Sequence, residues 1–377
     1  MNTTYELIHA LAPFIPECLK EAIRSRVQLR EYDFFMQKKA NPFRGMTEET
    51  YPECRYRFGI IEDVYQNHQY YVAACREMGV SYTVIDLLAD NWIERFRNSR
   101  FDVVLVWPSC ATTMVKQVFD YRLRILETDL GAPLYPAWRE CWLTEHKPRL
   151  RDWLDAYKIP HPGTWVFHDR SRALEFAHDA PLPIVSKTAT GASATGVEIV
   201  RNRGALARII KQAFGPGLRP QGYDAYDRQR GYIYLQEYLP DAEEWRMVRI
   251  GESYFGYRKE KGPDGLHSGS GKWSWLDPGK ELLDLLKRVT DIGEFTSMDI
   301  DVFRTADDRL LVNELQTVFG CSTPVIYMKV DDVEGRYLWT DEDWKFEAGG
   351  YWRNHMCNLR IQYLLSRLDA RVHPRAH

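Results

Sequence analysis

At 377 residues the chain is too long for one ordinary hydrophobic core, so two or three subdomains are expected. The composition, 45% hydrophobic and 27% charged, is typical of a soluble globular protein, and a net charge of -3 excludes broad nucleic-acid binding, which needs a concentrated basic surface. No apolar run reaches the roughly 18 residues of a membrane span, and the first residues lack the pattern of a signal peptide, so a cytoplasmic protein with reduced thiols is expected.

The first third of the chain predicts a parallel sheet. Residues 1–56 are expected to form a helical extension that ends in a loop. Residues 57–135 then alternate short apolar runs with helical patterns, which predicts strands at 57–61, 81–86 and 102–108 and helices at 68–79, 91–99 and 112–130. This alternation is typical of parallel strands with helices on their faces.

Residues 136–230 are expected to form a second, α+β unit. Thr144 is the expected N-cap of its first helix. A strand, a helix, a second strand and a glycine-rich loop follow, at 164–167, 171–179, 183–187 and 188–196. A further helix at 203–215 leads into a polar segment, 216–230, which we interpret as a mobile loop.

Residues 231–325 predict antiparallel strands. Three strand patterns at 231–240, 244–251 and 253–261 precede an amphipathic helix at 281–293, whose apolar face carries Leu282, Leu285, Leu286 and Val289. A hairpin follows at 297–316, and residues 326–377 are expected to form an extension that ends in a helix.

The stretch "SKTATGASATG" contains a candidate phosphate loop. Gly191 and Gly196 would let backbone N–H groups approach an anion closely, and Lys187 would supply a positive charge. The loop matches neither GxGxxG nor GxxxxGK[ST], so the pattern equally suits an ordinary hairpin turn.

The hairpin at 297–316 carries the stronger signal. Pairing across its turn brings Asp301 close to Glu314, and Gln316 points to the same face as Glu314. Two carboxylates and an amide oxygen suit Mg²⁺ (or Mn²⁺), with water and phosphate oxygens completing the shell. The alternative is a solvated strand face with ordinary salt bridges.

Taken in order, these pieces resemble the ATP-grasp superfamily, which includes D-alanine–D-alanine ligase and the RimK-like ligases. The resemblance covers roughly residues 57–325 and is strongest in "DVFRTADDRLLVNELQTVFG", followed by "PIVSK" with "GASATG", "LQEYL" and "EHKPRL". It implies an N-terminal parallel α/β domain (57–135) and two α+β lobes (136–230 and 231–325) that enclose ATP, with extensions at 1–56 and 326–377.

The resemblance also implies roles for individual residues. The phosphates would be held by Lys147, Lys187 and the loop with Gly191, Ser193 and Gly196. The adenine pocket would be lined by Gln236, Glu237, Tyr238 and Leu239, and the ribose would be held by Glu244. Asp301, Glu314 and Gln316 would bind magnesium, and Arg246, Arg258 and His267 would surround the transferring phosphate. For the arginines salt bridging is the alternative, and for His267 an ordinary loop residue.

One residue departs from the family pattern. Gln316 stands where the family has asparagine, and its extra methylene puts a second magnesium site in doubt.

The expected function is therefore an ATP-dependent carboxylate–amine ligase that works through an acyl phosphate. The alternatives are a kinase-type ATP-grasp enzyme and an inactive nucleotide-binding regulatory protein. The expected partners are small-molecule carboxylates and amines, such as an amino acid, a peptide or a sugar acid, with no nucleic acid and no membrane. A homodimer stays open.

Overall fold

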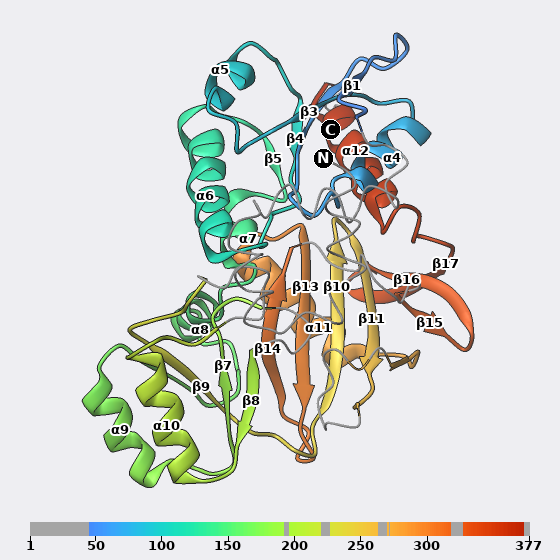
Figure 1. The fold of residues 1–377 in the computed structure, drawn as a ribbon. Helices are drawn as coiled ribbons and strands as arrows, with labels where there is room; N and C mark the ends of the chain where they lie inside the picture. The colour runs from blue at the N-terminus through green and yellow to red at the C-terminus, as the bar shows by residue number, and fades with distance from the viewer. Residues whose placement is uncertain are drawn as a thin grey trace, which may run out of the picture.

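The computed structural model describes residues 45–191, 196–219, 227–262, 270, 272–317 and 327–372. The structure contains three sheets, each with helices packed on it. The largest, which carries β10, β11, β13 and β14, lies between the other two (Figure 1). No helix in these ranges is long and apolar enough to cross a membrane. The predicted mixed α/β architecture is confirmed.

The first sheet is built from the predicted parallel strands. Its order is β1 (Glu48–Glu49), β3 (Ser81–Ile85), β2 (Arg57–Ile61), β4 (Val103–Leu105) and β5 (Leu134–Tyr135). All neighbours pair in parallel except the short edge strand β1. The helices of this unit are α4 (Gln69–Glu77), α5 (Trp92–Arg97) and α6 (Thr113–Arg124), which continues as the π-helix η3 (Ile125–Asp129). Because β2 pairs with β3 on one side and β4 on the other, the chain reverses its direction of winding between β2 and β4.

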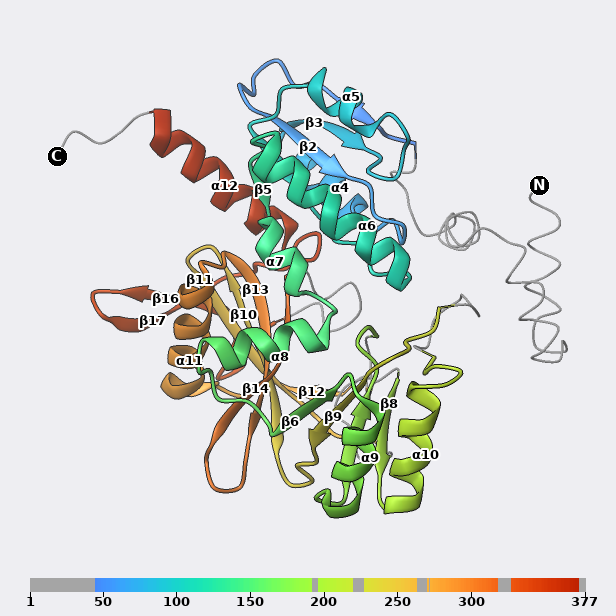
Figure 2. The same ribbon diagram turned by 90° about the vertical axis from the view of Figure 1, so that its left-hand side faces the viewer.

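The second sheet is small and antiparallel, with the order β6 (Thr164–Phe167), β9 (Ile233–Glu237), β7 (Ile184–Lys187) and β8 (Val197–Val200). Helices α9 (Arg170–Asp179) and α10 (Arg203–Ala213) pack on one face of it (Figure 2), around Leu206, Ile209 and Ile210. The boundary expected at residue 230 lies later in the chain, after β9. This strand pairs with β6 and β7 rather than with the strands that follow it.

The third sheet is the largest. Its order is β14 (Leu310–Gln316), β13 (Ser297–Arg304), β10 (Glu243–Ile250), β11 (Ser253–Lys259), β16 (Val333–Thr340) and β15 (Lys329–Val330); β12 (Trp273–Ser274) pairs with β11 and β17 (Asp343–Ala348) with β16. Helices α8 (Lys147–Ala156) and α11 (Gly279–Gly293) cover one face. The predicted apolar stripe of α11 is buried there at all four positions. The opposite face carries a second apolar core around Val248 and Phe255, and beside it the polar side chains of Arg246 and Asp301.

The C-terminal segment is not a separate extension. Its strands β15 to β17 extend the third sheet, and these strands were not predicted. The predicted terminal helix is present as α12 (Cys357–Val372), and it packs against α4. Cys357, Ile361 and Leu364 lie in the same core as the strands of the first sheet. The end of the chain thus completes the unit with which the described residues begin.

The helix that opens the second unit starts later than predicted. Thr144 is not its N-cap, because it ends the preceding helix, α7 (Trp138–Leu143). The N-cap of α8 is His146, whose side chain accepts a hydrogen bond from the Arg149 backbone N–H. The Thr144 hydroxyl instead accepts from the Thr317 backbone N–H at 3.0 Å. It therefore ties this connection to the end of β14.

Glu140 on α7 joins the first unit to the third sheet. Its carboxylate is buried and accepts three backbone N–H bonds, from Ala137 at 2.7 Å and from Thr296 and Ser297 at 2.8 Å each. The first donor begins α7 and the other two begin β13. One carboxylate thus satisfies donors from two elements that are far apart in the sequence.

Replacing Glu140 by alanine is expected to lower the free energy of unfolding by about 2–4 kcal/mol, because three buried donors lose their acceptor. Glu140→Gln should cost less, since the amide oxygen can still serve Thr296 and Ser297. Urea unfolding followed by tryptophan fluorescence measures both. Equal stability of wild type and Glu140→Ala would contradict this prediction.

Candidate nucleotide and metal site

The predicted pairing of Asp301 with Glu314 is present in the structure. The two residues are direct partners across the β13–β14 ladder, and Gln316 pairs with Asp299. Beyond Asp301 the register shifts, so that Val302 pairs with Val312 and Asn313 is the extra residue of a β-bulge. Asp301 is 1% exposed, whereas Glu314 is half-buried. Two carboxylates therefore lie side by side on the face of the third sheet that is turned away from α8 and α11.

Asp301 is held by two cations from neighbouring strands. Arg246 on β10 donates from Nε and Nη2 to its two oxygens, at 2.9 Å each. Lys259 on β11 donates to Asp301 Oδ2 at 2.5 Å and to Glu244 Oε1 at 2.7 Å. Burial raises the pKa of Asp301, but the charges of Arg246 and Lys259 outweigh it and hold that pKa well below its ordinary value. Asp301 is consequently ionised at neutral pH.

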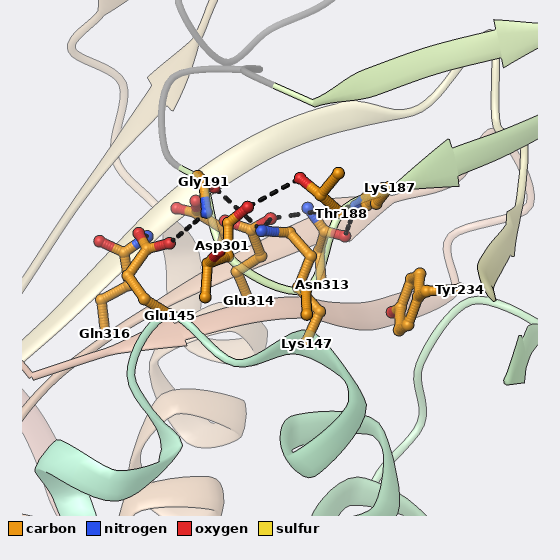
Figure 3. A network of polar contacts seen from close by, with 12 residues as sticks. Glu145, Lys147, Lys187, Thr188, Gly191, Tyr234, Asp301, Asn313, Glu314 and Gln316 are labelled. Carbon is orange, nitrogen blue, oxygen red and sulfur yellow. Dashed lines mark hydrogen bonds and ion pairs between the residues drawn. The ribbon is translucent and has the colours of Figure 1, made fainter. Parts of the chain in front are cut away.

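Glu314 lies between the two predicted phosphate-binding lysines (Figure 3). Its Oε1 is 3.6 Å from Lys147 Nζ and 4.0 Å from Lys187 Nζ. Lys187 also donates to Asn313 Oδ1 at 3.0 Å, so it contacts the residue that the bulge inserts. Burial raises the pKa of Glu314, but the two lysines reverse the effect and lower it. These contacts join the second unit to the third sheet through charge.

The glycine-rich loop begins in contact with Lys147 and Glu145. Lys147 Nζ donates to the Gly191 carbonyl at 3.0 Å, and the Gly191 N–H donates to Glu145 Oε2 at 3.2 Å. Gly191 and Gly196 have φ values of 131° and 71°, which L side chains rarely adopt. A Cβ at Gly196 would also collide with the Thr188 hydroxyl. The loop is thus anchored at its base to Glu145 and Lys147.

The predicted adenine segment runs from the end of β9 into the connection to β10. Gln236 is buried and donates to Thr164 Oγ1 and Tyr234 Oη, at 3.4 and 3.3 Å. Glu237 accepts from the Gly163 N–H at 3.0 Å, while Tyr238 and Leu239 are half-buried and follow the strand. The predicted ribose residue, Glu244, is buried beside Lys259.

One predicted residue lies elsewhere. Arg258 pairs with Trp245, whereas Arg246 pairs with Tyr257, so the two arginines lie on opposite faces of the third sheet. Arg258 binds Glu243 and Glu260, both at 2.9 Å, as an ordinary salt bridge. The structure therefore separates it from the Asp301 cluster. His267 and Ser193 fall outside the described residues.

Four neighbours of the site were not predicted: Asp299, Lys259, Asn313 and Glu145. Asp299 could have been found from its spacing, since it lies two residues before Asp301 and must share its face. To predict Lys259, the pairing of β11 with β10 would have had to be known. To predict Asn313, the bulge would have had to be known. Glu145 has a φ of 54° and depends on the connection between α7 and α8.

The side chains at this site can supply only part of the coordination shell of a magnesium ion. No three His, Cys, Asp or Glu side chains among the described residues gather closely enough to hold a metal ion. Asp301 and Glu314 offer hard oxygens, and the amide of Gln316 donates from Nε2 to Glu145 Oε1 at 3.4 Å, which leaves its own oxygen as the possible ligand. Water and phosphate oxygens would have to supply the rest.

Comparison with known proteins shows the fold. No family sequence model and no curated protein sequence matches the chain. Among solved structures, N5-carboxyaminoimidazole ribonucleotide synthetase in complex with ADP matches with a TM-score of 0.53 at 15% identity, over 74% of each chain. The D-alanine–D-alanine ligase of Bacillus anthracis matches with a TM-score of 0.51 at 16% identity, over 71% of this chain and 88% of the ligase. The chain has the ATP-grasp fold.

A third similar structure was solved with a metal nucleotide. The biotin carboxylase domain of the 2-oxoglutarate carboxylase of Hydrogenobacter thermophilus, in complex with MgADP, ADP and bicarbonate, matches with a TM-score of 0.50 at 14% identity. The match covers 71% of this chain and 65% of that domain chain.

Proposed function

We propose that this protein is an ATP-dependent ligase that joins a carboxylate to an amine, with magnesium as its metal. The observation that carries the proposal is the meeting of Glu314, beside Asp301, with Lys147 and Lys187 from the unit that bears the glycine-rich loop. An acidic strand face opposed by buried lysines suits a nucleotide whose phosphates bind both a metal and ammonium groups.

The nucleotide roles follow from this arrangement. Lys147 and Lys187 would pair with phosphate oxygens, and the backbone N–H groups near Gly191 would add hydrogen bonds. Gln236, Glu237, Tyr238 and Leu239 would line the adenine pocket, and Glu244 would accept from the ribose. The similar structures that contain ADP support a nucleotide here.

Asp301, Glu314 and Gln316 would hold the magnesium ion, which when bound neutralises phosphate charge and polarises the γ-phosphoryl group. In the first step the substrate carboxylate attacks the γ-phosphorus, the bond to the β-phosphate oxygen breaks, and ADP leaves. The amine then attacks the acyl carbon, inorganic phosphate leaves, and the nitrogen loses a proton. Lys187 and Arg246 would stabilise charge on the transferring group.

The carboxylate and amine would enter from the first sheet. Ligands of open α/β sheets bind at the carboxyl ends of the strands where the winding direction reverses, which here are the ends of β2 and β4.

A screen for ATP-dependent phosphate release across pairs of carboxylates and amines tests the proposal. We expect Mg²⁺-dependent release with at least one pair, together with ADP and an amide in the product. A phosphorylated product without release would indicate the kinase-type alternative. Nucleotide protection against thermal unfolding without any turnover would indicate a regulatory protein, and no binding of Mg²⁺ and nucleotide at all would refute the proposal.

A further inference from the structure

Asp299 is a buried carboxylate that makes no hydrogen bond within the described part of the chain. It is 0% exposed, and neither of its oxygens has a hydrogen-bond partner there. Among the described residues it pairs with Arg246, whose Nε lies 3.4 Å from Asp299 Oδ2. Burying an ionised carboxylate without hydrogen bonds is costly, so such a group calls for an explanation.

Arg246 lies between Asp299 and Asp301. The two aspartates are two residues apart on β13, so they share one face, and Arg246 pairs with Asp301 across the β10–β13 ladder. Its Nε is 2.9 Å from Asp301 Oδ1 and 3.4 Å from Asp299 Oδ2. A small shift of the guanidinium along the strand would exchange one carboxylate for the other.

The second cation on Asp301 has the same arrangement. Lys259 contacts Asp301 and also Glu244, at 2.7 Å. Each cation that covers the candidate metal ligand thus has a second carboxylate beside it. The difference is that Glu244 already accepts its hydrogen bond, whereas Asp299 does not yet accept one from Arg246.

A magnesium ion bound to Asp301 would compete with the arginine fork for its oxygens. The fork uses both carboxylate oxygens, and its positive charge opposes a divalent cation at the same place. We propose that Asp299 is a positioning residue that receives the Arg246 guanidinium when magnesium binds Asp301. The inference rests on the metal site of the proposed function. It concerns how Arg246 leaves Asp301 when the metal binds there.

The test measures metal binding rather than turnover. Asp299→Asn keeps the size of the side chain and removes the charge that would hold Arg246. We expect the Kd of Mn²⁺ in the presence of saturating ADP, followed by electron paramagnetic resonance, to rise about tenfold, the scale seen when a group supporting a metal ligand is lost. The Kd of ADP without metal should stay unchanged. Asp307→Asn, at the exposed turn of the same hairpin, is the matched control.

A second set of measurements, in an Arg246→Gln protein, distinguishes a positioning role of Asp299 from a direct effect of its charge on the metal. If Asp299 acts through Arg246, Asp299→Asn should have no further effect on the Mn²⁺ Kd in an Arg246→Gln protein. An equal loss in both backgrounds would overturn the inference, because Asp299 would then act on the metal directly. Unchanged Mn²⁺ affinity in the single variant would overturn it as well.

A crystal structure of the wild type with MgADP gives an independent test if Asp299→Asn does not fold. We expect Arg246 to donate to Asp299 at about 2.9 Å, the length of a charge-assisted hydrogen bond, with Asp301 on the metal. An Arg246 fork still on both oxygens of Asp301 would refute the inference alone. Wild-type protein that binds no Mn²⁺ with ADP would instead refute the proposed function, and the inference with it.

Discussion

Replacing Glu314 by glutamine is expected to lower Mg²⁺-dependent phosphate release about 100- to 1,000-fold, since a metal at a phosphoryl group contributes several kcal/mol. The glutamine keeps the shape of the side chain but loses the charge. Glu314 is ionised in the fold because Lys147 and Lys187 lower its pKa, so at neutral pH the whole effect of that charge is removed. Phosphate release over a series of Mg²⁺ concentrations measures the loss.

The control for Glu314→Gln is Asp307→Asn, which removes a carboxylate from the exposed turn of the same hairpin and should leave release unchanged. Circular dichroism establishes whether each variant is folded, since Glu314→Gln leaves two buried lysines without a carboxylate. Full activity of folded Glu314→Gln would exclude it as a metal ligand.

Replacing Lys187 by methionine is expected to weaken ADP binding about 10- to 100-fold, because a charge-assisted hydrogen bond to a buried group contributes about 1.5–3 kcal/mol. Methionine fills a similar volume without charge. Lys187 is 7% exposed, and burial lowers its pKa although Glu314 opposes the change. The lost contact would be the one to phosphate, so the Kd of ADP from tryptophan fluorescence is the measurement.

Lys211→Met on α10 is the matched control, because this exposed lysine belongs to the same unit but lies on the outer helix. Its ADP affinity should equal that of the wild type. If Lys187→Met also binds ADP normally, the glycine-rich stretch is an ordinary turn and not a phosphate loop.

The sequence predicted part of the site from periodicity alone. The length of the 297–316 hairpin and the alternation of its side chains were enough to bring Asp301 and Glu314 together, and the structure pairs them directly. The same reasoning could not predict that Asn313 faces Lys187, because a bulge changes the alternation by one residue.

The arginines mark the limit of this reasoning. Arg246 and Arg258 are both on strands, and their positions suggested a common role. Which face each occupies depends on the register of β10 against β11, which puts Tyr257 rather than Arg258 opposite Arg246. A shift of one residue in that register would have put both arginines on the same face.

The sequence by itself determined the local elements of this protein: the parallel βα units, the apolar face of α11, the glycine-rich turn and the acidic hairpin. These depend on side-chain spacing over a few residues, which the chain carries directly. Only the tertiary structure decided that α12 returns to the first sheet, that β9 belongs to the second, and that Asp299, Arg246, Lys259 and Asp301 form one charged cluster. These contacts join residues far apart in the chain, and they depend on strand register and packing that short-range patterns do not specify.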